Sequence, residues 1–381
     1  MNVSLGVRLA SLILLIGSTS ACLNPFPPLQ RPRIERGQSQ PVSQIPAQPK
    51  WEHKKSVQNP VPVNFDVSTE TGKVMNDAFN ALAKEDFQWL EQEAGKARRE
   101  KERLFGGYWK IANMYFGLSG PSIAADEEWK KHFERLNRWK EKFPESITAR
   151  VALAESWIDY AWQARGGGFA YTVTDEGRRL FNERINFAEK ELFEAKSLEQ
   201  RCPHWFASLM VVGRTQGWDL EDFDGVYQEA VKFEPHYYYY ALEKATYLFP
   251  RWHGSIGDWE AFVEQAANEA GGTQGEILYY LVVSDYLRDY SDAPYDRSKL
   301  SMPRVNQGFY TLKKTYGADN QRLNEFAKFA CRINDYLTAH EAFEEIGGNW
   351  LEGTWRSKES FDRYKSMAAL SRKFYDRQNR R

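Results

Sequence analysis

The sequence predicts an all-α fold: a solenoid of helical hairpins with degenerate repeats, preceded by a disordered, proline-rich tether. Three observations predict this class. Apolar residues recur at three- and four-residue steps through residues 66–376, and no convincing run there alternates as a half-buried strand does. Pairs of Asp and a following aromatic residue recur along the same region. Nine of the 16 prolines fall between residues 22 and 65.

The composition limits the class of protein. The chain has 381 residues, of which 42% are hydrophobic and 27% charged, so it can bury a sizeable core and wholesale disorder is excluded. Its 51 Lys and Arg nearly balance 52 Asp and Glu. Proteins that bind nucleic acid are usually basic, so we expect no nucleic-acid partner. Three cysteines are too few for a disulfide scaffold.

Residues 1–21 have the character of a lipoprotein signal peptide. A single charged residue, Arg8, precedes the apolar stretch Leu9–Ile16, which is too short to span a hydrocarbon core of about 30 Å. The following Thr19-Ser-Ala-Cys22 resembles a bacterial lipobox, with Thr in place of the usual Leu. In such a box the cysteine is acylated and becomes the mature N-terminus. We therefore predict lipidation of Cys22; the alternative is an ordinary secretory signal cut before Cys22.

Residues 22–65 predict an extended tether between the lipid and the body. The prolines there fix φ and remove backbone donors, so no packed element is expected. Six basic and two acidic residues make this segment positive, which suits anionic headgroups; a plain spacer is the alternative. Leu23, rather than Asp, follows the cysteine. The anchor is therefore expected in the outer membrane, facing the periplasm, if the host is Gram-negative.

The body, residues 66–376, is expected to be helical throughout. Apolar sets at helical spacing lie within residues 147–161, 181–195 and 323–333. Glycines follow such segments at several points, where glycine supplies the left-handed residue that ends a helix. The nearest candidate for a strand is the stretch around Val173, which is too short to build a sheet.

Internal repeats are indicated by the Asp–aromatic pairs, which begin at Asp86, Asp222, Asp258 and Asp335. Each pair is expected to open the second helix of a tetratricopeptide-like hairpin. There the Asp caps free N–H groups, and small residues one and two turns later let the partner helix approach. The pattern is only moderately stronger than chance pairing, so an irregular helical bundle is the competing architecture.

A longer set of motifs carries a resemblance. Residues 159–170 read Asp-Tyr-Ala-Trp-Gln-Ala-Arg-Gly-Gly-Gly-Phe-Ala, and Pro203-His-Trp205 and Gln216-Gly-Trp218 follow. Residues 248–254 read Leu-Phe-Pro-Arg-Trp-His-Gly. Together they resemble a bacterial family numbered 4034 among domains of unknown function, over roughly residues 150–290. The resemblance implies a tetratricopeptide-like helical domain and no catalytic residues, so it leaves the function open.

The known motifs of catalysis and metal binding are missing from the sequence. The six histidines include no pair at i, i+3 or i, i+4, and Cys202-Pro-His204 offers two ligands where zinc needs three or four. Gly166–Gly168 lacks the Lys and Ser or Thr of a phosphate-binding loop, and Gly-x-Ser-x-Gly does not occur. We expect no catalytic residue, no cofactor and no metal. Cys202 and Cys331 would either pair in an oxidising periplasm or stay free.

Two segments hold the candidate partner-binding residues. Arg251, Trp252 and His253 lie in a turn between two expected helices. Arg and Trp are favoured at binding surfaces because each buries a large area and makes directed polar contacts. Arg165 and Tyr171 belong to a second segment that would line a groove. The alternative for the turn is that Trp252 covers the core between helices while Arg251 satisfies carbonyl groups at a helix end.

Two classes of function fit these observations. The first is a lipid-anchored scaffold whose helical-repeat body binds an envelope protein or peptide on a concave surface, without catalysis. The alternative is an enzyme or small-ligand binder acting on the cell wall or a surface glycan, because Trp, Tyr and Arg suit sugar stacking and carboxylate pairing. Glycoside cleavage needs two carboxylates across a cleft, and the sequence nominates no pair.

Overall fold

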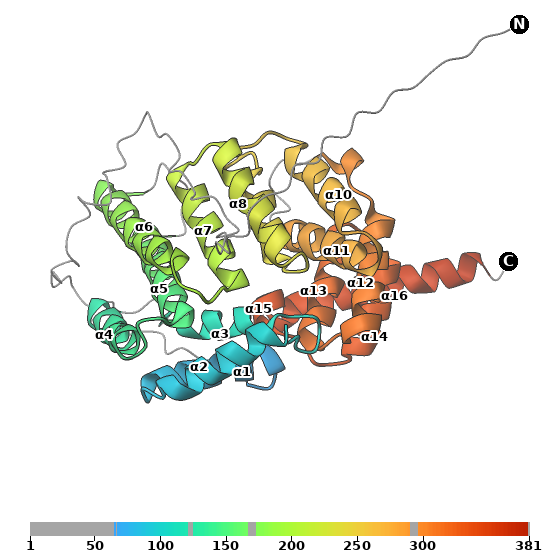
Figure 1. The fold of residues 1–381 in the computed structure, drawn as a ribbon. Helices are drawn as coiled ribbons and strands as arrows, with labels where there is room; N and C mark the ends of the chain where they lie inside the picture. The colour runs from blue at the N-terminus through green and yellow to red at the C-terminus, as the bar shows by residue number, and fades with distance from the viewer. Residues whose placement is uncertain (1–64, 66, 121–124, 167–172, 290–295, 380–381) are drawn as a thin grey trace, which may run out of the picture. The chain divides into compact units, whose positions relative to one another are not determined.

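The computed structural model describes residues 65, 67–120, 125–166, 173–289 and 296–379. All of them belong to the larger of two compact units, residues 39–381. The expected signal peptide, Cys22 and nearly all of the expected tether lie outside the described residues. The described part of the chain forms sixteen α-helices and one 3-10 helix and contains no strand, so the all-α prediction is confirmed (Figure 1).

The first fourteen α-helices follow one another as seven consecutive pairs, which we call hairpins; in the second pair, α4 packs mainly on α5. Their bounds are α1 (Glu70–Ala83) with α2 (Phe87–Arg99), α3 (Lys110–Leu118) with α4 (Asp126–Lys142), α5 (Ile147–Arg165) with α6 (Asp175–Lys196), α7 (Pro203–Gln216) with α8 (Leu220–Phe233), α9 (Tyr239–Tyr247) with α10 (Asp258–Ala270), α11 (Gly272–Asp289) with α12 (Met302–Tyr316), and α13 (Asn320–Arg332) with α14 (Tyr336–Ile346). The 3-10 helix η3 (Arg297–Lys299) precedes α12, and α15 (Glu352–Trp355) and α16 (Lys358–Gln378) close the series.

The odd-numbered helices form one continuous layer. Each of them from α1 to α13 contacts the next odd-numbered helix along the chain, and α13 contacts α15. The even-numbered helices pack against neighbouring odd-numbered helices, as in a stack of helical hairpins. This regular alternation is that of a helical-repeat fold and not of an irregular bundle. We call the row of odd-numbered helices the inner layer.

Close approach between helices depends on small residues. A side chain at Gly117 of α3 would place its Cβ 2.2 Å from the carbonyl oxygen of Met75 in α1, and one at Gly308 of α12 would lie 2.3 Å from that of Glu276 in α11. Atoms do not come so close, so only glycine fits at these two crossings. The small residues that the repeat pattern predicts at helix contacts are also buried: Ala94, Ala230, Ala266 and Ala339.

Two of the four Asp–aromatic pairs begin their helices as predicted. Asp86 is the N-cap residue of α2 and Asp335 that of α14, and each carboxylate accepts a hydrogen bond from a backbone N–H three residues later. The apolar residues that follow these pairs are buried, Leu90 and Phe343 among them. At these two helices, the predicted N-cap and the predicted buried positions are both confirmed.

The predicted cap is wrong at the other two pairs. Asp222 lies inside the first turn of α8, whose N-cap is Asp219; the backbone N–H of Asp222 donates to the Asp219 carboxylate at 2.9 Å. Asp258 is the first residue of α10, and Gly257, with φ of 95°, precedes it as the N-cap. The repeats therefore share their buried positions, while the start of each second helix shifts by a few residues.

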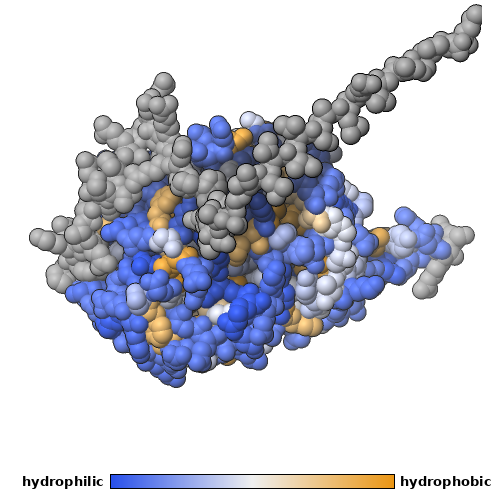
Figure 2. Space-filling view, viewed as in Figure 1, coloured by the Kyte–Doolittle hydropathy of each residue, from blue (hydrophilic) through white to orange (hydrophobic). Residues whose placement is uncertain are grey.

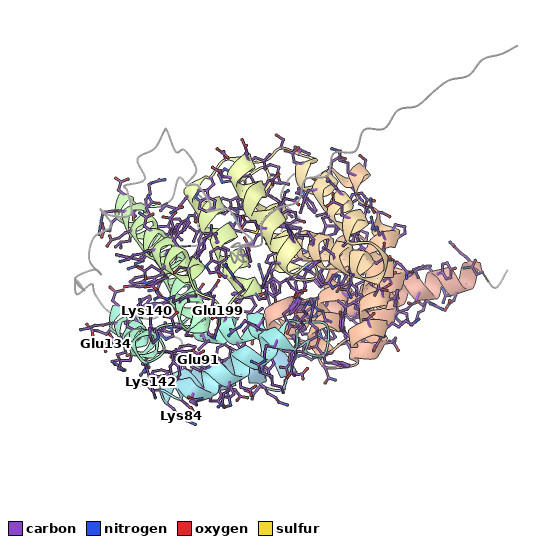
Figure 3. All side chains as sticks on the ribbon, in the orientation of Figure 1. Lys84, Glu91, Glu134, Lys140, Lys142 and Glu199 are labelled. Carbon is purple, nitrogen blue, oxygen red and sulfur yellow. The ribbon has the colours of Figure 1, made fainter. Side chains whose placement is uncertain are left out.

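Polar side chains also join neighbouring hairpins. Glu91 of α2 accepts a hydrogen bond from the Trp139 indole N–H of α4 at 2.8 Å and another from the hydroxyl of Ser146, the N-cap of α5. Lys140 of α4 lies 2.7 Å from Glu191 of α6. Figure 3 labels Glu91 and Lys140, which lie near the junction of α2, α4 and α5. These charge-assisted bonds link the first three hairpins.

The segment between α2 and α3, residues 100–109, packs against distant parts of the inner layer. The Arg103 guanidinium lies 3.3 Å from the ring centre of Trp109, and both side chains donate to the carbonyl oxygen of His236, at 3.2 Å each. Gly106 donates its N–H to Tyr316 at 3.1 Å and accepts a hydrogen bond from Arg322 at 3.1 Å. The first and seventh hairpins also meet directly, because the Thr71 hydroxyl of α1 donates to Gln321 of α13 at 3.3 Å. We call residues 100–109 the inserted loop.

Candidate functional site

The inner layer exposes a strip of polar and aromatic side chains on α5 and α7. Glu155, Asp159 and Trp162 are spaced four and three residues apart on α5, so they lie on one face of that helix. Asp159 is exposed, and Glu155 and Trp162 are partly exposed. Ser208 of α7 contacts Glu155, which places the two helices side by side along this face. We call this surface the α5–α7 face.

Glu155 is held as a carboxylate at one end of the α5–α7 face. The imidazole Nε2 of His204 lies 3.3 Å from Glu155 Oε1, and the hydroxyl of Ser208 donates to the same oxygen. Burial works to raise the pKa of Glu155, but these two neighbours outweigh it and lower the pKa below its usual value. The other imidazole nitrogen, Nδ1, is 2.6 Å from the hydroxyl of Tyr237, two residues before α9, so this contact fixes the orientation of the ring.

The pKa of Asp159, one turn further along α5, is shifted in the opposite direction. Desolvation raises its pKa to about 7, and the nearby Glu155 charge adds to that rise, while a hydrogen bond with Ser119 works against it. Its side chain is nevertheless exposed to solvent. The two carboxyl groups on one helix face thus have pKa values that move in opposite directions.

At the other end of the α5–α7 face, two tryptophans in contact lie between two arginines; we call these four residues the Arg–Trp row. The Arg165 guanidinium lies 5.4 Å from the Trp162 ring centre, and that ring meets Trp252 edge-to-face at 6.2 Å. The Arg214 guanidinium of α7 lies 4.5 Å from the Trp252 ring centre and pairs with Glu243 at 3.0 Å. Both tryptophans are half-buried. Cation–π contacts of this kind hold the side chains in place while leaving ring surface accessible.

Three of the predicted partner-binding residues come together at this end. Trp252 contacts Trp162, which is stacked with Arg165, and the His253 imidazole is 2.8 Å from the carbonyl oxygen of Arg214. Arg251 is exposed, and its guanidinium lies over Phe249 at 5.4 Å, outside the Arg–Trp row. Tyr171 lies outside the described residues.

The residues that sequence analysis missed are Glu155, Asp159, Trp162 and Arg214. A signal for the first two was present in the sequence. They are the only acidic residues of the 19-residue helix α5, most of which is buried, and they stand one turn apart on one face. Arg214 gave no local signal, because its role depends on Trp252 of a later hairpin.

The described part of the chain offers no metal centre. It contains no group of three or more His, Cys, Asp or Glu side chains placed to hold an ion. Cys202 and Cys331 are free, buried thiols, so the disulfide considered between them is not formed. The Cys202 sulfur lies 3.4 Å from the Tyr115 hydroxyl, and burial raises the pKa of Cys331 to about 12, which keeps that thiol protonated.

Comparison with known proteins returns no relative. No family model, no curated protein and no solved structure matches this chain. The resemblance of residues 150–290 to the family numbered 4034 therefore gains no support and stays a prediction. Within the described helices, none is both long enough and apolar enough to cross a membrane. The face drawn in Figure 2 is mostly hydrophilic, with apolar side chains in separate patches.

Proposed function

We propose that this chain is a membrane-tethered binding protein of the bacterial envelope, anchored by lipid at Cys22. Its helical-repeat body would bind an extended segment of a protein partner along the α5–α7 face. The observation that carries the proposal is the Arg–Trp row at one end of the α5–α7 face. Its two half-buried tryptophan rings, Trp162 and Trp252, lie between Arg165 and Arg214. Stacked repeats commonly bind extended ligands on the inner layer.

The chemistry of the α5–α7 face suits a peptide. Trp and Arg are the residues that most often dominate protein interfaces, because they combine a large apolar area with directed hydrogen bonds. Here the two tryptophans are already fixed by neighbouring rings and guanidinium groups, so binding would cost little side-chain entropy. Asp159, one turn from Trp162, adds a carboxyl group that would accept from a backbone N–H or a basic side chain of the partner.

Crosslinking in intact cells tests the proposal. The wild-type chain is compared with Cys22→Ala, with the double variant Trp162→Ala/Trp252→Ala, and with Trp350→Ala as a matched control, since Trp350 is also half-buried but follows α14. We expect one envelope protein to crosslink to the wild type and to Trp350→Ala. It should be lost from the double variant, and lost or reduced when Cys22 is replaced. Equal crosslinking of the double variant and the control would refute the α5–α7 face as the binding surface.

A second candidate, action on cell-wall glycan, is favoured by one observation. Glu155 and Asp159 are paired carboxyl groups whose pKa values shift in opposite directions, as those of an acid and a base do. Both stand on the same face of α5, however, whereas glycosidase carboxylates flank the scissile bond from two sides. Sugar binding against Trp162 is thus better supported than cleavage. Retention of the chain on purified cell wall, abolished by Trp162→Ala, would favour this candidate over the protein partner.

A further inference from the structure

A cavity at the C-terminal end of the repeats is rich in positive charge. It has a volume of about 200 Å³ and lies where α13, α15 and α16 meet. Its lining includes four cationic side chains and two hydroxyl groups, those of Lys328, Arg332, Arg356, Arg363, Thr354 and Ser360. None of the described residues that line it is Asp or Glu. We call it the C-terminal cavity.

The backbone turns sharply at this cavity. Arg356 has φ of 65° and ψ of −30°, a left-handed conformation that is uncommon for a residue other than glycine. Such a conformation costs free energy and is held by its surroundings. Arg356 joins α15 to Ser357, which is the N-cap of α16 and accepts a hydrogen bond from Ser360 N at 3.2 Å. The turn therefore brings an arginine and the first turn of a 21-residue helix to the same cavity.

Arg356 and Arg363 are exposed and line the same cavity, so two guanidinium groups can reach one ligand there. Arginine matches the geometry of phosphate through paired N–H donors, and hydroxyl groups complete the hydrogen bonding of its oxygens. A cavity needs a volume of roughly 10–15 Å³ to hold a single water molecule. The C-terminal cavity, at about 200 Å³, therefore has room for a phosphate group and a small substituent. We propose that the C-terminal cavity binds a phosphate group, through Arg356 and Arg363. This inference does not depend on the partner proposed for the α5–α7 face.

The phosphate would come from one of two sources, a soluble phosphate or the headgroup of an anionic phospholipid. The remainder of α16 favours the second source, a phospholipid headgroup. Beyond the cavity this helix projects from the body (Figure 1), and Met367, Leu370 and Phe374 are 39%, 54% and 61% exposed at i, i+3 and i+7. Lys373 and Arg377 are exposed beside them. An apolar stripe next to basic residues suits a membrane interface.

Calorimetric titration of the full chain tests the proposal, with Cys22→Ala so that no acyl chain is attached. The probes are inorganic phosphate and dihexanoylphosphatidylglycerol below its micelle concentration, each against sodium chloride at equal ionic strength. We expect one site for at least one probe. Arg356→Gln/Arg363→Gln should weaken it at least tenfold, whereas Lys373→Gln/Arg377→Gln removes the same charge from outside the cavity and should leave phosphate binding within twofold.

A second variant guards against misfolding of the double arginine variant. Ser360→Asp leaves all four cations in place and puts an acidic residue in the first turn of a helix, where it is tolerated. It should also weaken binding at least tenfold, with an unchanged circular dichroism spectrum. Binding of phosphate alone would identify a soluble source. Tighter binding of the lipid, reduced by Leu370→Ser/Phe374→Ser, would identify a headgroup. Absence of binding by both probes, or equal loss in the control pair, would overturn the proposal.

Discussion

Two parts of the same inner layer differ in how much of their surface is exposed to solvent. Just before α9, the inserted loop covers the layer: Trp109 of the loop contacts Tyr237, and each of them is 1% exposed. On α5 and α7, the same layer leaves Asp159 exposed and Trp162 half-buried. Both parts contain aromatic side chains in contact with arginine. The difference is whether a segment of the chain itself covers them.

This comparison shows how a helical-repeat layer becomes core in one place and a binding surface in another. The inserted loop folds back on itself, with an antiparallel bridge between Arg103 and Trp109. Both of these side chains donate to the backbone of His236, just before α9, and Gly106 donates to the backbone of Tyr316 at the end of α12. Its contacts bridge residues more than 100 positions apart. On α5 and α7 the layer has the same chemistry but leaves Asp159 exposed and Trp162 half-buried, which is why we place the partner there.

The largest expected effect is at the covered part of the layer. Trp109→Ala removes a fully buried ring that contacts Arg103 and Tyr237 and an N–H bonded to His236. Truncation of a buried Trp typically costs about 3–5 kcal/mol of the free energy of unfolding. Urea denaturation followed by circular dichroism measures it. A loss below about 1 kcal/mol would mean that the inserted loop is not part of the core.

A second large effect is expected at Arg322, which joins the inserted loop to α13. Its guanidinium pairs with Glu325 at 3.0 Å, donates to the carbonyl oxygen of Gly106 and lies 3.8 Å from the Tyr108 ring centre. Arg322→Gln leaves a buried carboxylate and carbonyl without these donors, so we expect a loss of about 3 kcal/mol. Arg372→Gln is the control: it removes an exposed pair with Asp376, and we expect a loss below about 0.5 kcal/mol. Similar losses in both variants would contradict the buried role of Arg322.

The two parts of the layer also differ in how far the sequence predicts them. Helix period and small residues are local signals, so the all-α class and buried positions such as Leu90 and Ala94 were predictable. Trp252 was found because Arg and Trp in a turn form a local motif. The inserted loop was not found, because its contacts with His236 and Arg322 join residues 133 and 216 positions apart. The misplaced caps at Asp222 and Asp258 reflect a one- to three-residue shift that tertiary packing decides.

A small effect on stability is expected on the α5–α7 face. Trp252 is half-buried and its ring rests on Arg214 and Trp162, so Trp252→Ala should reduce the free energy of unfolding by only about 1 kcal/mol. Urea denaturation beside Trp109→Ala gives a direct comparison of the two parts of the layer. A loss as large as that of Trp109→Ala would show that Trp252 covers the core, the alternative considered from the sequence, and would remove it from the proposed binding surface.

The smallest expected effect is the change of stability with pH that the two carboxyl groups on α5 cause as they titrate. The folded protein holds the proton of Asp159 up to a pKa of about 7, whereas the unfolded chain releases it near 3.8. Asp159 therefore lowers stability progressively as pH rises from about 4 to 7. Glu155, whose pKa is lowered, contributes stability that is lost as pH falls below its usual value of 4.5.

Two variants separate these contributions. Asp159→Asn should flatten the fall in stability between pH 4 and 7. Glu155→Gln should lower the pKa of Asp159, because it removes a like charge, but desolvation should still hold it above the ordinary value. Carbon-detected NMR of the side-chain carboxyl groups measures both pKa values in one titration. If Asp159 titrates near 4 in the wild type, its carboxyl group is freely solvated, and a partner would have to bind through the tryptophans alone.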